Sequence, residues 1–253
     1  MAVIATPRRD ERTAVNDGLA RRLFDRRLFL AISIAFAGIV LVGFGRTFYL
    51  RDLFDVPPLP SRLVSVHGFL MTAWVALFLT QVRLIARQRV RVHRRLGYSA
   101  IALAGLIIAT GVPVAVRAAK YGSASKPPGI PPLAFLAVPL FDLLMFVLLF
   151  GGAIYFRTRP RAHKTLMLLT VVNFLPPALG RMAFAAPLGP LWFLGLPAAI
   201  AVGCLVLEAR RYGSLNRVFL AGTILLVLSY PARLMLMGTD AWIAFATFAT
   251  SFV

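Results

Sequence analysis

Acidic residues and cysteine are scarce in this sequence of 253 residues. It has nine Asp and Glu residues against 28 Lys and Arg, together with three histidines and a single cysteine. A carboxylate cage for a metal ion needs several acidic side chains close together, so we expect no site of that kind. Cys204 has no second cysteine to pair with, which excludes an intrachain disulfide. Its position in an apolar run is typical of a small buried hydrophobic residue.

Several motifs that mark well-known catalytic centres are also absent. We find no phosphate-binding loop, no dinucleotide-binding glycine pattern, no HExxH zinc motif and no serine nucleophile elbow. The sequence therefore leaves open whether the protein is an enzyme. The candidate functional residues are its histidines and the polar residues of its membrane segments.

What the chain has in excess is apolar and basic residues. Hydrophobic residues make up 59% of it, the mean hydropathy is +0.80 and the formal net charge is +19. A soluble domain of this length has no room to bury so much apolar surface. The basic residues lie in short segments between apolar runs and do not form one continuous face. We therefore expect a lipid bilayer as the partner, and no nucleic acid.

Seven apolar runs are long enough to cross a bilayer. They cover residues 28–49, 63–86, 96–117, 132–156, 164–184, 188–207 and 217–237. We predict an all-α polytopic membrane bundle of about seven transmembrane helices over residues 28–237. Residues 1–27 are predicted as a basic cytoplasmic tail. Residues 238–253 are predicted as a helix in the outer interface, with Asp240 or Thr239 as its N-cap.

The connecting segments predict the orientation of the bundle. Arg and Lys gather in the N-terminal tail and in residues 87–95, 157–164 and 210–217, whereas the alternate connections carry fewer basic residues. By the positive-inside rule, the N-terminus is expected in the cytoplasm and the C-terminus outside.

One basic segment occurs twice. Residues 87–96 read RQRVRVHRRL and residues 157–166 read RTRPRAHKTL, each placed between two apolar runs. The repeat predicts two related helical hairpins in the same orientation. His93 and His163 are then expected at the inner ends of two helices, at the same membrane depth.

Two neutral imidazoles can hold a haem iron as axial ligands, so His93 and His163 are candidate ligands. Neighbouring cations could pair with the haem propionates. These cations are Arg94, Arg95 and Lys164. The alternative interpretation makes both histidines interfacial residues of a basic loop that binds lipid headgroups.

His67 lies in the sequence VHGFLMTAW, a few residues inside an apolar run. A polar ring at this depth usually faces the bundle or a cavity. Gly68 would allow another helix or a flat cofactor to approach closely, and Trp74 and Gln81 lie near the same helix face. His67 is thus a candidate ligand or proton carrier. The alternative is a structural histidine bonded to a backbone carbonyl or a neighbouring helix.

Polar residues also interrupt the outer halves of the predicted helices. The set comprises Arg46, Arg117, Asp142, Asn173, Arg181 and Arg233. A buried carboxylate is costly unless it is paired, so we expect Asp142 beside at least one of the four arginines. Together with His67 these residues predict an outward-opening polar pocket for an anion. The alternative is that the arginines extend separately to the headgroup level.

Motifs along nearly the whole chain from residue 28 resemble a bacterial family of multi-helix integral membrane proteins that has no assigned activity. They are GRTFY (45–49), VHGFLMTAW (66–74), VHRRLGY (92–98), FLAVPLFD (135–142), RAHKTLMLL (161–169), YPARL (230–234) and DAWIAFA (240–246). The resemblance implies a multi-pass protein of the bacterial inner membrane with the topology given above.

The HGFLMTAW stretch, followed by histidines on later helices, is more loosely similar to cytochrome b561-type electron carriers. That similarity implies four core helices that hold two b-type haems, each between two histidines. His67, His93 and His163 match three of the four positions; the fourth is missing, and Asp142 is the nearest polar residue there. One haem b between His93 and His163 is therefore expected, with electron transfer to a redox partner as the function. The alternative function is non-enzymatic binding or transport of an anionic or amphipathic small molecule through the outer pocket.

Overall fold

The computed structural model describes residues 9–122, 129–182, 187–189 and 191–253. Helices make up 84% of the structure, and the described residues contain no strand. The main helices are α1 (Arg9–Phe44), α2 (Arg62–Ala86), α3 (Val90–Tyr121), α5 (Ala137–Tyr155), α6 (Pro160–Asn173), α8 (Leu196–Tyr212), α9 (Arg217–Leu236) and α10 (Asp240–Thr250). The shorter elements are η1 (Gly45–Tyr49), η2 (Arg51–Leu53), α4 (Pro132–Phe135), α7 (Leu175–Leu179) and η4 (Leu191–Gly195). The all-α prediction is confirmed.

Six of the described helical segments are long and apolar enough to cross a membrane. They cover Asp25–Tyr49, Arg62–Ala86, Val90–Tyr121, Pro132–Tyr155, Leu191–Tyr212 and Arg217–Leu236. The protein is therefore a multi-pass membrane protein. The seventh crossing, expected at 164–184, coincides with two shorter helices, α6 and α7, so the count of seven stays a prediction.

Proline explains why this segment is broken. Pro176 and Pro177 lack the backbone N–H that would continue the hydrogen bonds of α6. Helix α6 accordingly ends at Asn173, and α7 begins at Leu175 with prolines in its first turn. Residues 173–175 are all buried, as expected for a helix break at membrane depth.

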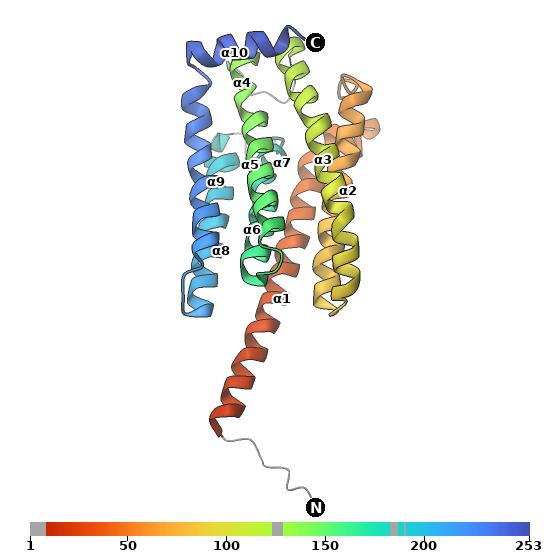
Figure 1. Ribbon diagram of the computed structural model, residues 1–253. Coiled ribbons are helices and arrows are strands. Elements are labelled where there is room, and N and C mark those ends of the chain that lie inside the picture. Colours follow the sequence, from red (N-terminus) through yellow and green to blue (C-terminus); the bar gives the residue numbers. More distant parts are fainter. Residues whose placement is uncertain (1–8, 123–128, 183–186, 190) are drawn as a thin grey trace, which may run out of the picture.

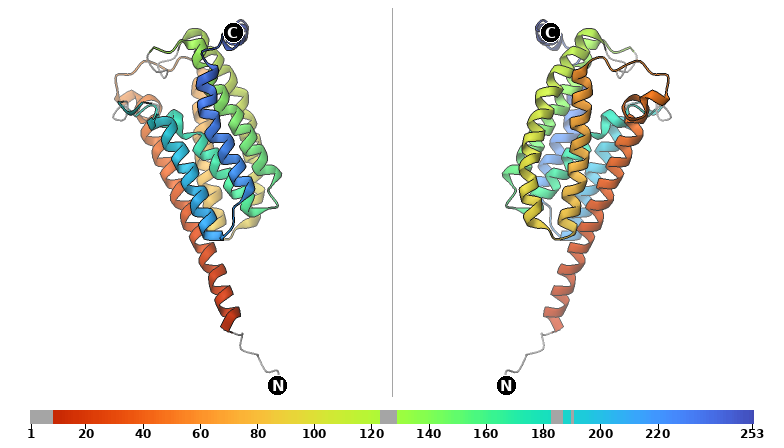
Figure 2. Two further views of the ribbon diagram at one scale, coloured as in Figure 1. Left: turned by 90° about the vertical axis from the view of Figure 1, so that its left-hand side faces the viewer. Right: turned by 90° about the vertical axis from the view of Figure 1, so that its right-hand side faces the viewer.

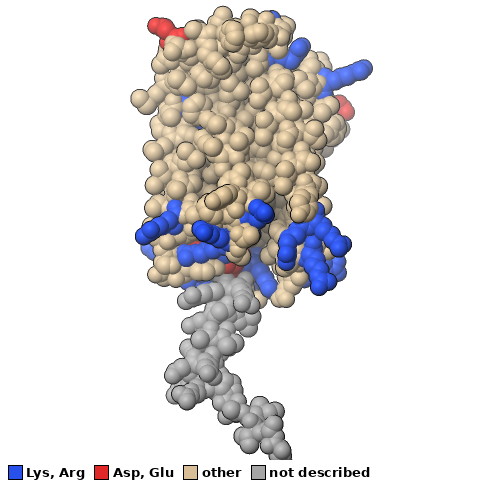
Figure 3. Space-filling view, viewed as in Figure 1, with Lys and Arg blue, Asp and Glu red and all other residues tan. Residues whose placement is uncertain are grey.

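The basic connections are shorter than the sequence suggested. Helix α3 begins at Val90 and α6 at Pro160, so most of the segments 87–95 and 157–164 are helical. The α2–α3, α5–α6 and α8–α9 connections lie together at the end of the bundle from which α1 projects (Figure 1). We call this the basic end, because Lys and Arg side chains gather there (Figure 3). The cytoplasmic location of this end stays a prediction of the positive-inside rule.

At the opposite end, α10 lies across the other helices (Figures 1 and 2). Its N-cap is Thr239 and not Asp240: the Thr239 hydroxyl accepts a hydrogen bond from the backbone N–H of Trp242 at 3.2 Å. Trp242 is buried against α3 and α4, and its indole N–H donates to the Leu133 carbonyl at 3.1 Å. Phe248 and Phe252 of the same segment are exposed.

The core of the bundle joins α2, α5 and α6. Trp74 is 2% exposed and packs edge-on against Phe146 and Phe150, with ring centroids 5.0 and 5.3 Å away. Phe146 in turn contacts Phe174, which follows α6. On the other side, α1 approaches α7 so closely at Gly43 that any side chain there would overlap the backbone of Ala178. These contacts hold the broken α6–α7 segment inside the bundle.

Candidate functional site: a histidine pair at the basic end

His93 and His163 lie side by side. Their ring centroids are 6.3 Å apart and the ring planes are nearly perpendicular, at 79°. Both residues are half-buried. The prediction that the two copies of the repeat bring their histidines to the same end of the bundle is confirmed.

The two histidines occupy equivalent places in their helices. Each is the fourth residue of its helix, and each donates its backbone N–H to the carbonyl of the arginine that precedes the helix, Arg89 or Arg159, at 3.0 Å. Helix α3 packs mainly on α2 and α5, whereas α6 packs mainly on α5, α8 and α9. The two imidazoles therefore approach each other from helices that share little other contact.

The hydrogen bond of His163 fixes its tautomer. Nδ1 of His163 lies 2.8 Å from the carbonyl oxygen of Ala153 on α5. A carbonyl oxygen can only accept, so Nδ1 must carry the proton and donate it. Nε2 of neutral His163 then keeps its lone pair, which is the arrangement found in metal-ligating histidines.

His93 is held differently, by Gln81 of α2. The Gln81 amide satisfies both of its ends when its nitrogen donates to His93 Nδ1 at 2.6 Å and to the His93 carbonyl at 3.3 Å. Its oxygen then accepts from the backbone N–H of Gly97 at 3.2 Å. In this arrangement Nδ1 of His93 is an acceptor, so neutral His93 carries its proton on Nε2. Helical spacing predicted Gln81 near the face of His67, whereas in the structure its amide lies against His93.

The surroundings of the pair are strongly basic. The exposed arginines of the two repeats and their flanks are Arg87, Arg89, Arg91, Arg94, Arg95, Arg157 and Arg159. Arg94 and Arg95, two of the cations expected to meet haem propionates, are therefore exposed beside His93. Lys164, the third, is already paired: it contacts the Asp25 carboxylate and donates to the Tyr212 hydroxyl at 2.9 Å.

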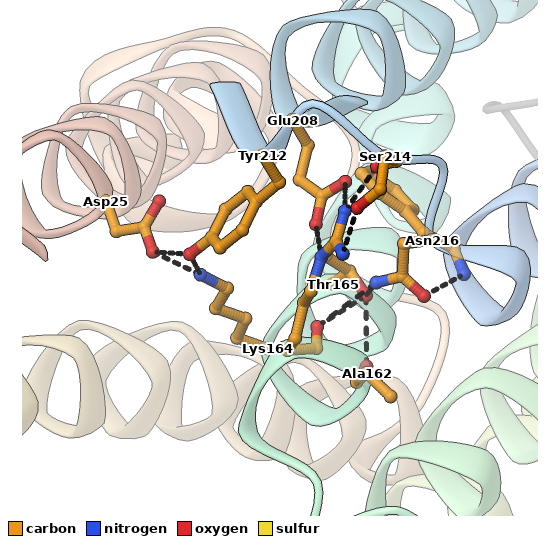
Figure 4. Close-up of polar contacts among 10 residues, drawn as sticks. Asp25, Ala162, Lys164, Thr165, Glu208, Tyr212, Ser214 and Asn216 are labelled. Carbon is orange, nitrogen blue, oxygen red and sulfur yellow. Dashed lines mark hydrogen bonds and ion pairs between the residues drawn. The ribbon is translucent and has the colours of Figure 1, made fainter. Parts of the chain in front are cut away.

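Lys164 belongs to a polar network that no sequence motif predicted (Figure 4). The network joins three helices: Asp25 lies on α1, Lys164 on α6 and Tyr212 on α8. The Tyr212 hydroxyl also donates a hydrogen bond to Asp25, at 2.6 Å. Arg161 makes a bidentate ion pair with Glu208: Nε donates to Oε1 at 2.5 Å, and Nη2 donates to Oε2 at 2.9 Å. The only sequence signal was that Asp25 and Glu208 are acidic residues at the basic end of apolar runs.

Asn216 connects this network to α9. Its side chain caps α9 by accepting from the backbone N–H of Phe219 at 3.3 Å, and its amide donates to the Arg161 carbonyl and to Thr165. The network places the start of α6, and therefore His163, against three other helices.

His67 lies apart from this pair. Its Nδ1 is 3.0 Å from the hydroxyl of Thr110 on α3, and its ring lies over Gly111, where a side chain would crowd it. Gly68 leaves room for the Phe48 ring, so a side chain of the helical segment η1 occupies the space beside it. The described contacts of His67 are those of a histidine bonded to a neighbouring helix.

Asp142, Asn173 and Arg233 are brought together in the bundle interior. Nη1 of Arg233 donates to Oδ1 of Asp142 at 2.5 Å, and the Asn173 amide donates to the Asp142 backbone carbonyl at 2.8 Å. Arg233 also binds the carbonyl and hydroxyl of Ser229. The prediction that Asp142 lies beside one of the four arginines is confirmed for Arg233.

The other three arginines make separate contacts. The Arg46 guanidinium lies over the Phe54 ring at 5.1 Å, and that of Arg117 lies over Tyr121 at 5.4 Å. Arg181 lies over Phe44 at 4.4 Å and donates to the Pro177 carbonyl at 2.6 Å. These contacts join Arg46 to Phe54, Arg117 to Tyr121 on its own helix, and Arg181 to Phe44 of α1.

Comparison of the chain with protein-family models, with curated proteins and with solved structures finds no match.

Proposed function

We propose that the protein is a haem-binding membrane protein in which His93 and His163 are the two axial ligands of one b-type haem. The observation that carries this proposal is the juxtaposition of the two repeated histidines, 6.3 Å apart between ring centres. A metal–imidazole bond is about 2 Å long, so two imidazoles on opposite sides of one iron have ring centres roughly 6 Å apart. The separation of the two rings fits that requirement.

The nitrogen atoms of the two imidazoles can also bind iron, provided that the Gln81 side chain changes its orientation. His163 already presents the Nε2 lone pair, because its Nδ1 proton is bound by the Ala153 carbonyl. His93 presents the same lone pair once the Gln81 amide turns over and accepts the Nδ1 proton.

The charges favour haem over a bare metal ion. A divalent cation would meet a cluster of exposed arginines, whereas the propionates of haem would find partners in Arg94 and Arg95. Structural and catalytic zinc sites use three or four protein ligands.

A bound haem would supply a one-electron couple, so the proposed activity is electron transfer with a redox partner at the basic end. By the positive-inside rule this end faces the cytoplasm, and the proposed location is the inner membrane of a bacterium. The half-buried histidines and their arginine surroundings would orient the haem edge toward that side.

Haem titration followed by visible spectroscopy tests this proposal. Purified protein should give a Soret shift that saturates at one haem per chain, and His93→Ala and His163→Ala should each abolish it. His67→Ala is the matched control, since His67 is bonded to Thr110 and should leave the titration unchanged. Retention of full binding by both His93→Ala and His163→Ala would refute the ligand assignment.

A second candidate function uses the outer half of the bundle. Asn173 Oδ1 and the Tyr230 hydroxyl are buried without a hydrogen-bond partner among the described residues. The Asn173 amide contacts the Asp142 carbonyl, and the Arg233 guanidinium lies over the Tyr230 ring at 5.1 Å. Buried polar atoms without partners are costly, and a small polar ligand reaching them would relieve that cost. Under this alternative the protein binds or transports an anionic or amphipathic molecule. Asn173→Leu should then weaken uptake or binding of such a molecule without changing haem binding.

A further inference from the structure

The two histidines of the pair have opposite tautomers. His163 donates from Nδ1 to the Ala153 carbonyl, which leaves its Nε2 free of a proton. His93 accepts at Nδ1 from the Gln81 amide, which leaves its proton on Nε2. Only His163 is ready to bind a metal through Nε2.

The Gln81 amide is fixed by more than the imidazole. Besides His93 Nδ1, it faces the His93 carbonyl at 3.3 Å and the Gly97 N–H at 3.2 Å. If the amide turned over, its oxygen would face the His93 carbonyl oxygen and its NH2 group would face the Gly97 N–H. Both contacts would then be between like groups, so turning the amide over has a cost.

We propose that Gln81 is a positioning residue that holds ligand-free His93 in the Nε2–H tautomer and must turn over before His93 can bind iron. The effect on haem binding rests on the proposed function. The tautomer of His93 rests only on the geometry of the ligand-free protein. Gln81 thereby lowers the affinity of the histidine pair for haem and makes haem binding readily reversible.

Two substitutions at this position separate the tautomer effect from folding. Gln81→Glu supplies acceptors for a proton on His93 Nδ1 and for the Gly97 N–H at the same time. A carboxylate has no donor, so it cannot hold the Nε2–H tautomer, although one of its oxygens then faces the His93 carbonyl. Gln81→Leu removes the donor without supplying an acceptor. Gln88→Glu is the control for added charge, because Gln88 is exposed in the α2–α3 connection of the same basic end.

The first measurement is 15N NMR of ligand-free protein labelled at histidine, with His93→Ala and His163→Ala to assign the signals. The wild-type protein should show His93 as the Nε2–H tautomer and His163 as the Nδ1–H tautomer. In Gln81→Glu both histidines should be Nδ1–H, and in Gln81→Leu the preference of His93 should disappear. An Nδ1–H tautomer of His93 in the wild-type protein would overturn the proposal.

The second measurement is the dissociation constant of ferric haem. Gln81→Glu should bind haem about tenfold more tightly than wild type, the size of effect that partners of metal-ligating histidines commonly have. Gln88→Glu should match wild type, and Gln81→Leu should bind no more weakly than wild type. Weaker binding by Gln81→Leu, or no gain by Gln81→Glu over Gln88→Glu, would contradict the proposal. If neither the wild-type protein nor any variant binds haem, the proposed function is wrong. The NMR measurement then still shows whether Gln81 sets the tautomer of His93.

Discussion

Arg233 places Nη1 2.5 Å from Oδ1 of Asp142 although 91 residues separate them in the chain. Arg233 is 0% exposed and Asp142 6% exposed, so the pair lies in the interior of the bundle. Breaking a buried ion pair leaves one charge uncompensated, which costs more than replacing both charges by apolar groups.

Asp142→Asn should therefore lower the free energy of unfolding by about 3–5 kcal/mol. The double variant Asp142→Leu/Arg233→Met should be destabilised less than either corresponding single variant, because neither charge remains. Thermal unfolding in detergent measures both effects, and Leu144→Ala, on the exposed side of the same helix, is the control. Additive effects of the two single changes would show that the pair is not coupled.

The ion pair between Arg161 and Glu208 should stabilise the basic end in a similar way. Glu208 is 7% exposed and accepts two hydrogen bonds from Arg161. Glu208→Gln should lower the free energy of unfolding by about 1–3 kcal/mol, less than at Asp142 because Arg161 is partly exposed. The Arg51–Asp52 ion pair gives the contrast: Asp52 has a side chain that is 98% exposed, so Asp52→Asn should not change stability measurably. Equal effects at Asp52 and Glu208 would contradict this account.

Because α1 packs closely on α7, we expect Gly43 and Gly38 of α1 to respond differently to substitution. Gly43→Ala should destabilise the protein by about 1–3 kcal/mol, because the new methyl group would overlap the Ala178 backbone. At Gly38, no atom lies within 4 Å of where a methyl group would be. Gly38→Ala should therefore be neutral, or stabilising by up to about 1 kcal/mol from helix propensity. Thermal unfolding of the two variants side by side checks the difference, which should vanish if α1 does not pack on α7.

The orientation of the bundle can be tested by cysteine labelling in spheroplasts. In a Cys204→Ser background, Arg89→Cys and Arg159→Cys should react with a membrane-impermeant maleimide only after permeabilisation. Ser251→Cys, at the exposed end of α10, should react in intact spheroplasts. The reverse pattern would place the basic end outside.

The sequence was sufficient for features that depend on local pattern. Apolar runs located the six segments that are long and apolar enough to cross a membrane, although α1 extends back to Arg9, well before the run that begins at residue 28. The repeated arginines predicted that His93 and His163 would share one end of the bundle. The cost of an unpaired carboxylate predicted a cationic partner for Asp142, though not which of the four arginines it would be. Such inferences need only composition, periodicity and the energetics of burial.

Features that depend on how helices rotate against each other could not be predicted. The contact of Gln81 with His93 joins two helices of one hairpin, and it requires a particular rotation of α2 that no sequence period specifies. The pairing of Asp25 with Lys164, and of Glu208 with Arg161, depends on which helices are neighbours in space. The break after Asn173 was signalled by Pro176 and Pro177, but an apolar run alone predicted a continuous helix.

Electron paramagnetic resonance of the ferric, haem-loaded protein tests most directly whether one iron lies between His93 and His163. Two imidazole ligands give six-coordinate, low-spin iron, so the wild-type protein should show a low-spin signal. His93→Ala and His163→Ala should each convert residual bound haem to a high-spin signal or remove it, while His67→Ala keeps the low-spin signal. A high-spin signal in the wild-type protein, or a low-spin signal that survives either substitution in the pair, would contradict the account.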